Sequence, residues 1–164
     1  MKGQYMQVGS INLSIESDFK HVFLIGKAIS SLCSLANFSD MDSYQVELCV
    51  VEAVNNAIKH AYEEKEGNLL EVKFSLYQSK ITIAICDAGK VMDQNLLLRA
   101  RALPDFDAQD LDTLPEGGWG LAIMHQVMDE VTYSTSNGTN VLTLSKYFTP
   151  GKSDAGQHHA LPSA

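Results

Sequence analysis

Residues 50–62, VVEAVNNAIKHAY, constrain the fold of this chain more than any other stretch. On a helix that turns roughly 100° per residue, the segment separates into two sides. One side gathers valine, alanine and isoleucine, and the other carries Glu52, Asn55, Asn56, Lys59 and His60. Because the apolar side has to be buried, the sequence predicts an amphipathic helix that packs on a core and ends near residue 62.

The polar side of this helix has an unusual composition. A solvated helix face, which is the plainer interpretation, ordinarily uses Glu, Lys, Gln and Arg, whereas adjacent asparagines are poor helix formers. Glu52 and Asn56 lie one turn apart, and their side-chain oxygens suit a hard cation such as Mg²⁺. The residue types therefore favour a functional face.

Length and composition predict one globular domain. The chain has 164 residues, of which 45% are hydrophobic, and no apolar run reaches the length of a membrane span. No signal-peptide pattern opens the sequence, so we expect a cytoplasmic protein. Cys33, Cys49 and Cys86 form no CxxC pair and lie in apolar surroundings, which favours buried reduced thiols. The net charge of −8 argues against direct nucleic acid binding and does not exclude a local basic patch.

Hydrophobic periodicity predicts an α+β order of elements after a loose lead-in over residues 1–9. Ser17 or Asp18 is expected to cap the first helix, and Asp42 the second. The expected strands cover residues 11–15, 69–77, 81–85, 131–135 and 139–148, and the expected helices run from 18 to about 36, from 42 to 62, and over 121–128. The last four strands form two hairpins.

Residues 90–116 show no sustained strand pattern and carry much charge. A connection of this length is usually a functional lid or a disordered insert, and a short helix is expected over residues 94–102. The polar tail, residues 149–164, is expected to be disordered. The domain is thus predicted to cover residues 1–148.

Three short motifs follow one another along the chain. They are Glu52 with Asn56, Asp87-Ala88-Gly89 at a strand end, and Gly117-Gly118-Trp119-Gly120-Leu121 before a helix. Each has a plainer explanation alone, because Asp-x-Gly commonly forms a turn and glycines ease a tight entry into a helix. Their order and spacing make the set specific.

Together the motifs resemble those of the GHKL ATPases, which share the Bergerat fold, over residues from about 11 to 148. Residues 52–60 resemble the N box, 87–89 the G1 box and 117–121 the G2 box. The phrases EAVNNAIKHAY, GGWGLAIMHQVMDEV and GTNVLTLSKYF are most similar to bacterial serine-protein kinases that are also anti-sigma factors, the RsbW type. The chain departs mildly from that pattern in Trp119, where a smaller residue is usual, and in its extra tail.

This resemblance implies a two-layer α/β sandwich, with a mixed, mostly antiparallel sheet covered on one face by helices. It also implies that the protein binds ATP and Mg²⁺. Asp87 would accept a hydrogen bond from the adenine amine, and Gly89 would let the backbone approach the ring. Thr139 matches the threonine that helps to hold adenine. Residues 117–121 would surround the phosphates: Gly117, Gly118 and Gly120 with their backbone N–H groups, beside Trp119 and Leu121.

The catalytic roles implied by the resemblance fall on the amphipathic helix. Asn56 would supply an oxygen to Mg²⁺, and Glu52 would orient or deprotonate the attacking hydroxyl. Lys59 and His60 either contact phosphate or are solvated. His21 and His125 are interpreted as structural, because the helical dimerisation domain of a histidine kinase is missing.

The resemblance further implies partners. The substrate would be a STAS-domain anti-anti-sigma protein, and a sigma factor would be sequestered in a partner switch. A homodimer is expected through the first strand and helix, with Phe19 and Phe23 available, unless both belong to the core. The alternatives are a nucleotide-binding interaction module without kinase activity and a detached ATPase piece of a sensor or chaperone.

Overall fold

A computed structural model of the chain describes residues 6–36, 38–101 and 119–148. The elements in chain order are β1 (Gln7–Glu16), the 3-10 turn η1 (Phe19–His21), α1 (Val22–Leu35), α2 (Asp40–Asn56), the π turn η2 (Ala57–Ala61), β2 (Leu69–Tyr77), β3 (Lys80–Asp87), α3 (Gln94–Arg101), α4 (Trp119–Val127), β4 (Glu130–Ser136) and β5 (Thr139–Tyr147). The predicted α+β order and both hairpins are confirmed.

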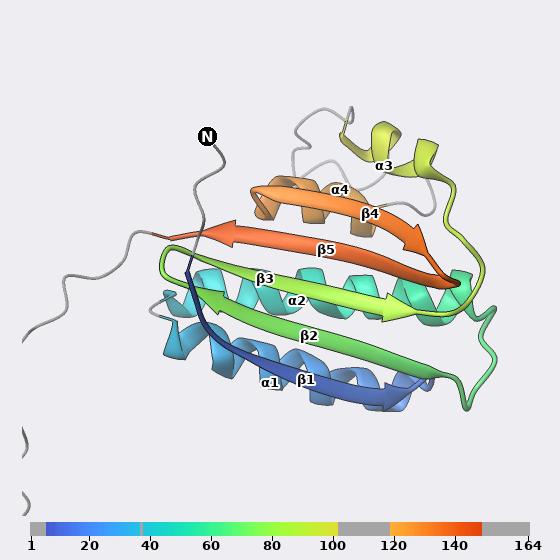
Figure 1. Cartoon of the computed structure of the whole chain (residues 1–164), viewed down its shortest axis with the longest axis horizontal. Coiled ribbons are helices and arrows are strands. Elements are labelled where there is room, and N and C mark those ends of the chain that lie inside the picture. The colour runs from blue at the N-terminus through green and yellow to red at the C-terminus, as the bar shows by residue number, and fades with distance from the viewer. Residues whose placement is uncertain (1–5, 37, 102–118, 149–164) are drawn as a thin grey trace, which may run out of the picture.

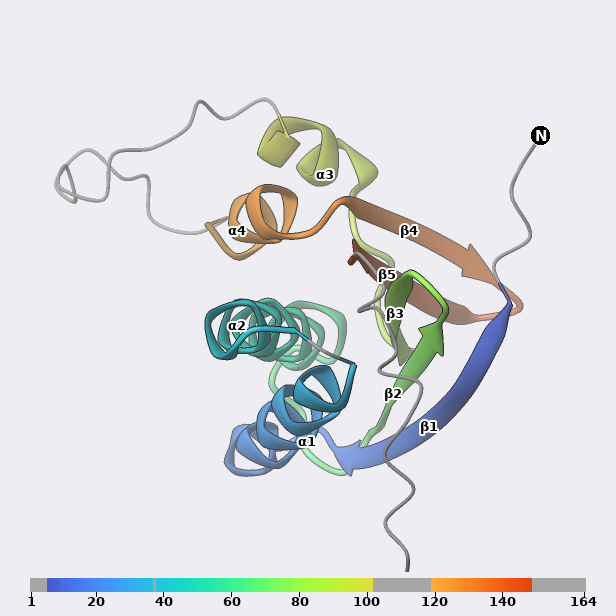
Figure 2. The same ribbon diagram turned by 90° about the vertical axis from the view of Figure 1, so that its left-hand side faces the viewer.

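The strands form one sheet in the order β1-β2-β3-β5-β4, in which every neighbouring pair is antiparallel (Figure 1). Helices α1, α2 and α4 cover one face of this sheet, and α3 lies beyond α4 (Figure 2). The two-layer sandwich is therefore confirmed, with a wholly antiparallel sheet where a mixed one was allowed. In the described part of the chain, no helix combines the length and apolarity needed to cross a membrane.

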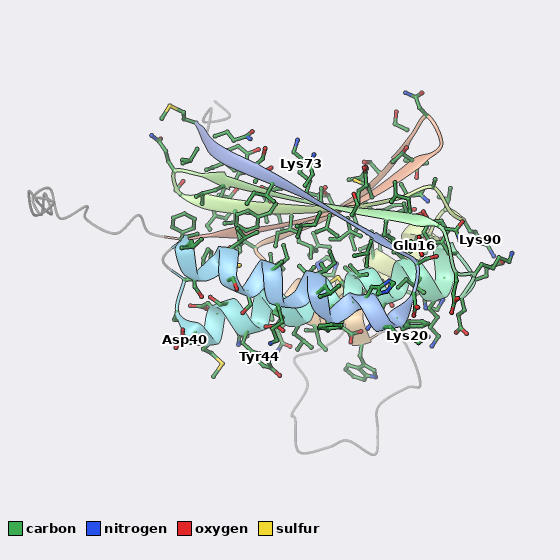
Figure 3. All side chains as sticks on the ribbon, turned by 90° about the horizontal axis from the view of Figure 1, so that it is seen from below. Glu16, Lys20, Asp40, Tyr44, Lys73 and Lys90 are labelled. Carbon is green, nitrogen blue, oxygen red and sulfur yellow. The ribbon has the colours of Figure 1, made fainter. Side chains whose placement is uncertain are left out.

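The core lies between the sheet and the helices because alternate strand residues point to one face. On β2 and β3 the buried residues alternate along each strand, and on the helices they lie on the side that faces the sheet. Fully buried members include Ile29, Val46, Val50, Val54, Ile58, Leu70, Val72, Ile81, Ile83, Ile85, Met124 and Leu144. Lys73, which alternates with these residues on β2, projects from the opposite, open face (Figure 3).

Local hydrogen bonds correct one predicted helix cap and confirm another. Helix α2 is capped by Ser39, whose hydroxyl accepts from the Asp42 N–H at 3.1 Å and donates to the Asp42 carboxylate at 2.6 Å, so Asp42 lies inside the first turn and does not cap the helix. Asp18 caps η1 as predicted. Ser17 has another role, because its buried hydroxyl donates to the Lys65 carbonyl at 2.6 Å and ties the end of β1 to the loop before β2.

The N-terminal strand is longer than predicted. It starts at Gln7, so part of the expected lead-in pairs with β2. The pattern underestimates this strand because it lies at the sheet edge, where Ile11 and its neighbours stay exposed. Phe19 and Phe23 are also exposed, by 48% and 63%, so the alternative that both belong to the core is wrong.

The predicted short helix after the G1 motif is confirmed as α3. The first part of the segment expected to be a lid or a disordered insert packs on the core, since Ala100 is buried and Met92 and Leu97 lie against the core. Residues 102–118 and the tail lie outside the described residues, so the lid, the tail and the domain boundary stay predictions.

The cysteine prediction is confirmed in most respects. All three thiols are free. Cys33 and Cys49 are fully buried, and burial raises the pKa of both thiols to about 12. Cys86 lies on β3 and is only half-buried.

Candidate active site

Glu52 and Asn56 are half-buried on the last turns of α2 and face the start of α4. A Cβ atom placed on Gly120 would lie 2.9 Å from Oε2 of Glu52 and 3.2 Å from Nδ2 of Asn56. A side chain at residue 120 would therefore require the Glu52 carboxylate to shift. The structure therefore brings the first and third sequence motifs into contact, with the positive N-terminal end of α4 beside the carboxylate.

Helix α2 changes geometry directly after Asn56. In η2 the Tyr62 N–H donates to the Ala57 carbonyl five residues earlier, at 3.0 Å. Such π turns are uncommon and often occur at functional sites. Lys59 and His60 lie within this turn and are exposed, in contrast to the half-buried Glu52 and Asn56. A phosphate contact by Lys59 or His60 stays a prediction.

The G1 motif forms a turn that is held against η2, the last turn of the helical segment that begins as α2, and against Tyr62. The Lys90 N–H donates to the Ala61 carbonyl at 2.8 Å, and the Ala88 N–H donates to the Tyr62 hydroxyl at 3.0 Å. A Cβ at Gly89 would collide with the Ala61 carbonyl oxygen. Residue 89 therefore has to be glycine for this packing contact, in addition to the predicted approach of its backbone to adenine. The second motif is thus attached to the same helix as the first.

Tyr62 connects this turn to β2. Its buried hydroxyl donates to the Leu69 carbonyl at 2.7 Å while accepting from the Ala88 N–H. Burial raises the pKa of the Tyr62 hydroxyl, and the Asp87 carboxylate raises it further, against the opposing effect of the Ala88 hydrogen bond. The hydroxyl therefore stays neutral and keeps the proton that it donates.

The two carboxylate oxygens of Asp87 differ in their hydrogen bonds. Its Oδ1 accepts from the Gly89 N–H at 2.9 Å and from Nδ2 of Asn140 at 2.8 Å. Within residues 6–36, 38–101 and 119–148, no hydrogen bond reaches Oδ2. An oxygen of this kind can accept a hydrogen bond from a ligand amine.

Asn140 was missed by the sequence interpretation, which assigned the adenine role in β5 to Thr139. The structure pairs Asn140 with Asp87 across β3 and β5, whereas Thr139 is exposed and pairs with Ser136 at the hairpin end. A usable signal was present, since Asn140 alternates with Leu142 and Leu144 and so falls on the buried face. The role of Thr139 stays a prediction.

Only part of the G2 motif, residues 117–121, lies in the described part of the chain. Gly117 and Gly118 lie outside the described residues. Trp119 opens α4 and is half-buried, and Leu121 is buried in the core. Leu121 thus positions the helix whose first turn contacts Glu52.

The residues present fit a magnesium nucleotide. An open carboxylate oxygen is available beside the glycine turn, and a helix start lies against a carboxylate and a carboxamide. Mg²⁺ in nucleotide sites takes one or two protein oxygens and completes its shell with phosphate and water. Asn56 would supply such an oxygen, in agreement with the metal-binding role predicted for it from the sequence.

Comparisons with known proteins agree with this geometry. Residues 15–146 match the model of the histidine kinase-like ATPase domain. Serine-protein kinase RsbW from Staphylococcus aureus strain MRSA252 is 32% identical over 138 residues, which cover 84% of this chain and 86% of that protein. The same kinase from strain Newman is 31% identical over the same coverage.

The chain belongs to the histidine kinase-like ATPase family. Within the GHKL superfamily it is a serine-protein kinase of the RsbW type. A solved structure, that of the SiaB–SiaC complex from Pseudomonas aeruginosa, has the same fold with a TM-score of 0.58 at 15% identity, over 87% of this chain and 89% of that one.

We predict that Asp87→Asn weakens the binding of ATP and ADP alike, because both share the adenine that Asp87 is expected to hold. Replacing the Oδ2 acceptor should cost on the order of 1–3 kcal/mol of binding free energy for each nucleotide. Calorimetric titration measures both affinities. Unchanged affinity for both nucleotides would show that Asp87 does not contact adenine.

Proposed function

We propose that this protein is an ATP-dependent serine-protein kinase and anti-sigma factor that phosphorylates a STAS-domain anti-anti-sigma protein and sequesters a sigma factor. The observation that carries the proposal is the contact of Gly120 with Glu52 and Asn56. It places a helix start suited to phosphate beside a carboxylate suited to proton transfer. RsbW relatives, named serine-protein kinases, support the same activity.

Glu52 is the proposed catalytic residue. As the hydroxyl oxygen of the acceptor serine bonds to the γ-phosphorus and ADP leaves, Glu52 orients that hydroxyl and accepts its proton. The carboxylate is half-buried and held beside Gly120, so its position is restricted by packing. Proton transfer of this kind contributes roughly 10²–10⁴-fold to a rate.

The other site residues bind and orient. When bound, ATP supplies the phosphoryl group, and Mg²⁺ supplies positive charge that neutralises the phosphate oxygens. Asn56 holds the metal, Asp87 holds adenine, and the backbone around residues 117–121 contacts the phosphates. Lys59 and His60 remain candidates for a phosphate contact.

The partner switch follows from charge. Two proteins compete for one surface of this kinase, and phosphorylation adds about two negative charges to one of them. Because the kinase has a net charge of −8, a phosphorylated partner is repelled more strongly than the unmodified one. The sigma factor then keeps the surface. All these partners are expected in the cytoplasm.

The direct test incubates the protein with labelled ATP, Mg²⁺ and candidate STAS partners from the same genome. Transfer of label to a serine of one partner supports the kinase. Nucleotide binding without transfer to any cognate partner would favour the interaction module without kinase activity.

Glu52 and Asn56 should respond differently to substitution, because one is proposed to act as a base and the other to hold the metal. Glu52→Gln keeps the shape and removes the base, so nucleotide and sigma-factor binding should stay near wild type while phosphotransfer slows by roughly 10²-fold or more. Asn56→Ala removes a metal ligand and should weaken Mg·ATP binding as well as transfer. Calorimetry and single-turnover kinetics separate the two effects. Full phosphotransfer by Glu52→Gln would remove the catalytic role of that residue.

A homodimer through β1 and α1 is also proposed. β1 is an edge strand whose first nine residues carry no charge, although edge strands usually have charges that discourage pairing. Val8 and Ile11 on β1, Phe19 in η1 and Phe23 on α1 are exposed, and a second copy at this edge would cover such apolar side chains.

We predict that light scattering at micromolar concentration gives a dimer mass for the wild type and a lower mass for Phe23→Ser, because that substitution places a hydroxyl in the apolar contact. Leu98→Ser is the control, since Leu98 is 67% exposed on α3, away from β1. A strictly monomeric wild type would contradict the proposal.

A further inference from the structure

Asn140 is the polar side chain most deeply buried near the proposed nucleotide site. It is 1% exposed and lies on β5 directly opposite Asp87 on β3. The next two inward positions along β5 are occupied by Leu142 and Leu144. A carboxamide in such a row loses hydration unless protein groups replace it, so its hydrogen bonds define what it does.

Three hydrogen bonds fix the orientation of this carboxamide. Nδ2 donates to Oδ1 of Asp87 at 2.8 Å and to the Gly89 carbonyl at 3.1 Å, and Oδ1 accepts from the Thr135 hydroxyl at 3.0 Å. Both groups facing Nδ2 are acceptors, namely a carboxylate and a carbonyl. A flipped amide would place oxygen against oxygen, so one orientation is fixed.

These bonds give the two oxygens of Asp87 different roles. Oδ1 is occupied by Asn140 and by the Gly89 N–H, and among the described residues no donor reaches Oδ2. With both N–H bonds on Oδ1, the carboxylate cannot rotate without losing them. Oδ2 is therefore presented as an acceptor, which suits an exocyclic amino group on the base and repels an exocyclic carbonyl oxygen.

We propose that Asn140 is a positioning residue that sets the base specificity of the nucleotide site by holding Asp87 so that it selects a 6-amino purine over a 6-oxo purine. This inference rests on the proposed binding of ATP by this site. Asn140 acts through Asp87 and the Gly89 turn, and needs no contact with the nucleotide itself.

The test compares ATP with ITP, which differs in having a 6-oxo group, by calorimetric titration in the presence of Mg²⁺. Two variants of the full chain remove the donor but differ in volume: Asn140→Leu fills the buried position, and Asn140→Ala leaves a cavity. Both should lower the ratio of ATP affinity to ITP affinity by roughly tenfold or more, since a hydrogen bond to a charged group is lost. Their melting temperatures should differ, because only one of them leaves a cavity.

The control is Thr143→Val on the same strand, which removes a hydroxyl from the opposite face and should keep the wild-type ratio. Equal loss of ATP and ITP affinity in both Asn140 variants, with the ratio unchanged, would overturn the inference and leave Asn140 a purely structural residue. A ratio that changes in Thr139→Val and not in the Asn140 variants would overturn it in favour of Thr139. Failure of the wild type to bind ATP would instead refute the proposed function.

Discussion

The contact between the G1 turn and η2, the last turn of the helical segment that begins as α2, is the interaction on which the site depends. The Lys90 N–H bonds to the Ala61 carbonyl at 2.8 Å, and Gly89 lies so close to Ala61 that a side chain would not fit. This contact ties the sheet to the helical layer at the end of the molecule away from Asp40, where Figure 3 places Lys90. Because Glu52 and Asn56 lie on the same helix, the adenine side and the phosphate side of the site share one support.

The G1 turn is held rigidly because several elements form hydrogen bonds with it or beside it. Tyr62 bonds to the turn and to β2, Asn140 bonds to the turn from β5, and the Met92 N–H just beyond it donates to the Tyr133 hydroxyl of β4 at 2.9 Å. Hydrogen bonds from several elements hold a site in place before a ligand binds, which lowers the cost of ordering it. The turn is preorganised by the fold as a whole.

Much of this arrangement could be predicted from the sequence, because it depends on local patterns. Alternation identified β2 and β3 and their buried faces, and helical periodicity identified the apolar side of α2. The spacing of the three motifs predicted that distant segments meet, and the Gly120 contact shows that two of them do. The Asn137-Gly138 turn, with φ of 52° and 77°, has the residues that a tight hairpin favours.

The rest could not be predicted, because it depends on register and on tertiary contacts. The π turn at 57–61 has no distinct local signal, and it occurs where Tyr62 is held by Leu69 and Ala88. The role of Asn140 depends on which β5 residue stands opposite Asp87, and a shift of one residue would exchange it with Thr139. Periodicity also could not tell whether Phe19 and Phe23 face the core or solvent. A helix has the same apolar stripe in its sequence whether that stripe is buried in the core or exposed.

The most direct test of the account measures phosphotransfer by Gly120→Ala. The added methyl group would lie 2.9 Å from Oε2 of Glu52, so the carboxylate has to move, while alanine should strengthen the helix itself. The account predicts a rate lowered by roughly tenfold or more at an unchanged or higher melting temperature, as displacement of a catalytic group implies. Gln126→Ala, at an exposed position of the same helix, should keep the wild-type rate. Wild-type phosphotransfer by Gly120→Ala would contradict the claim that the start of α4 and Glu52 form one active site.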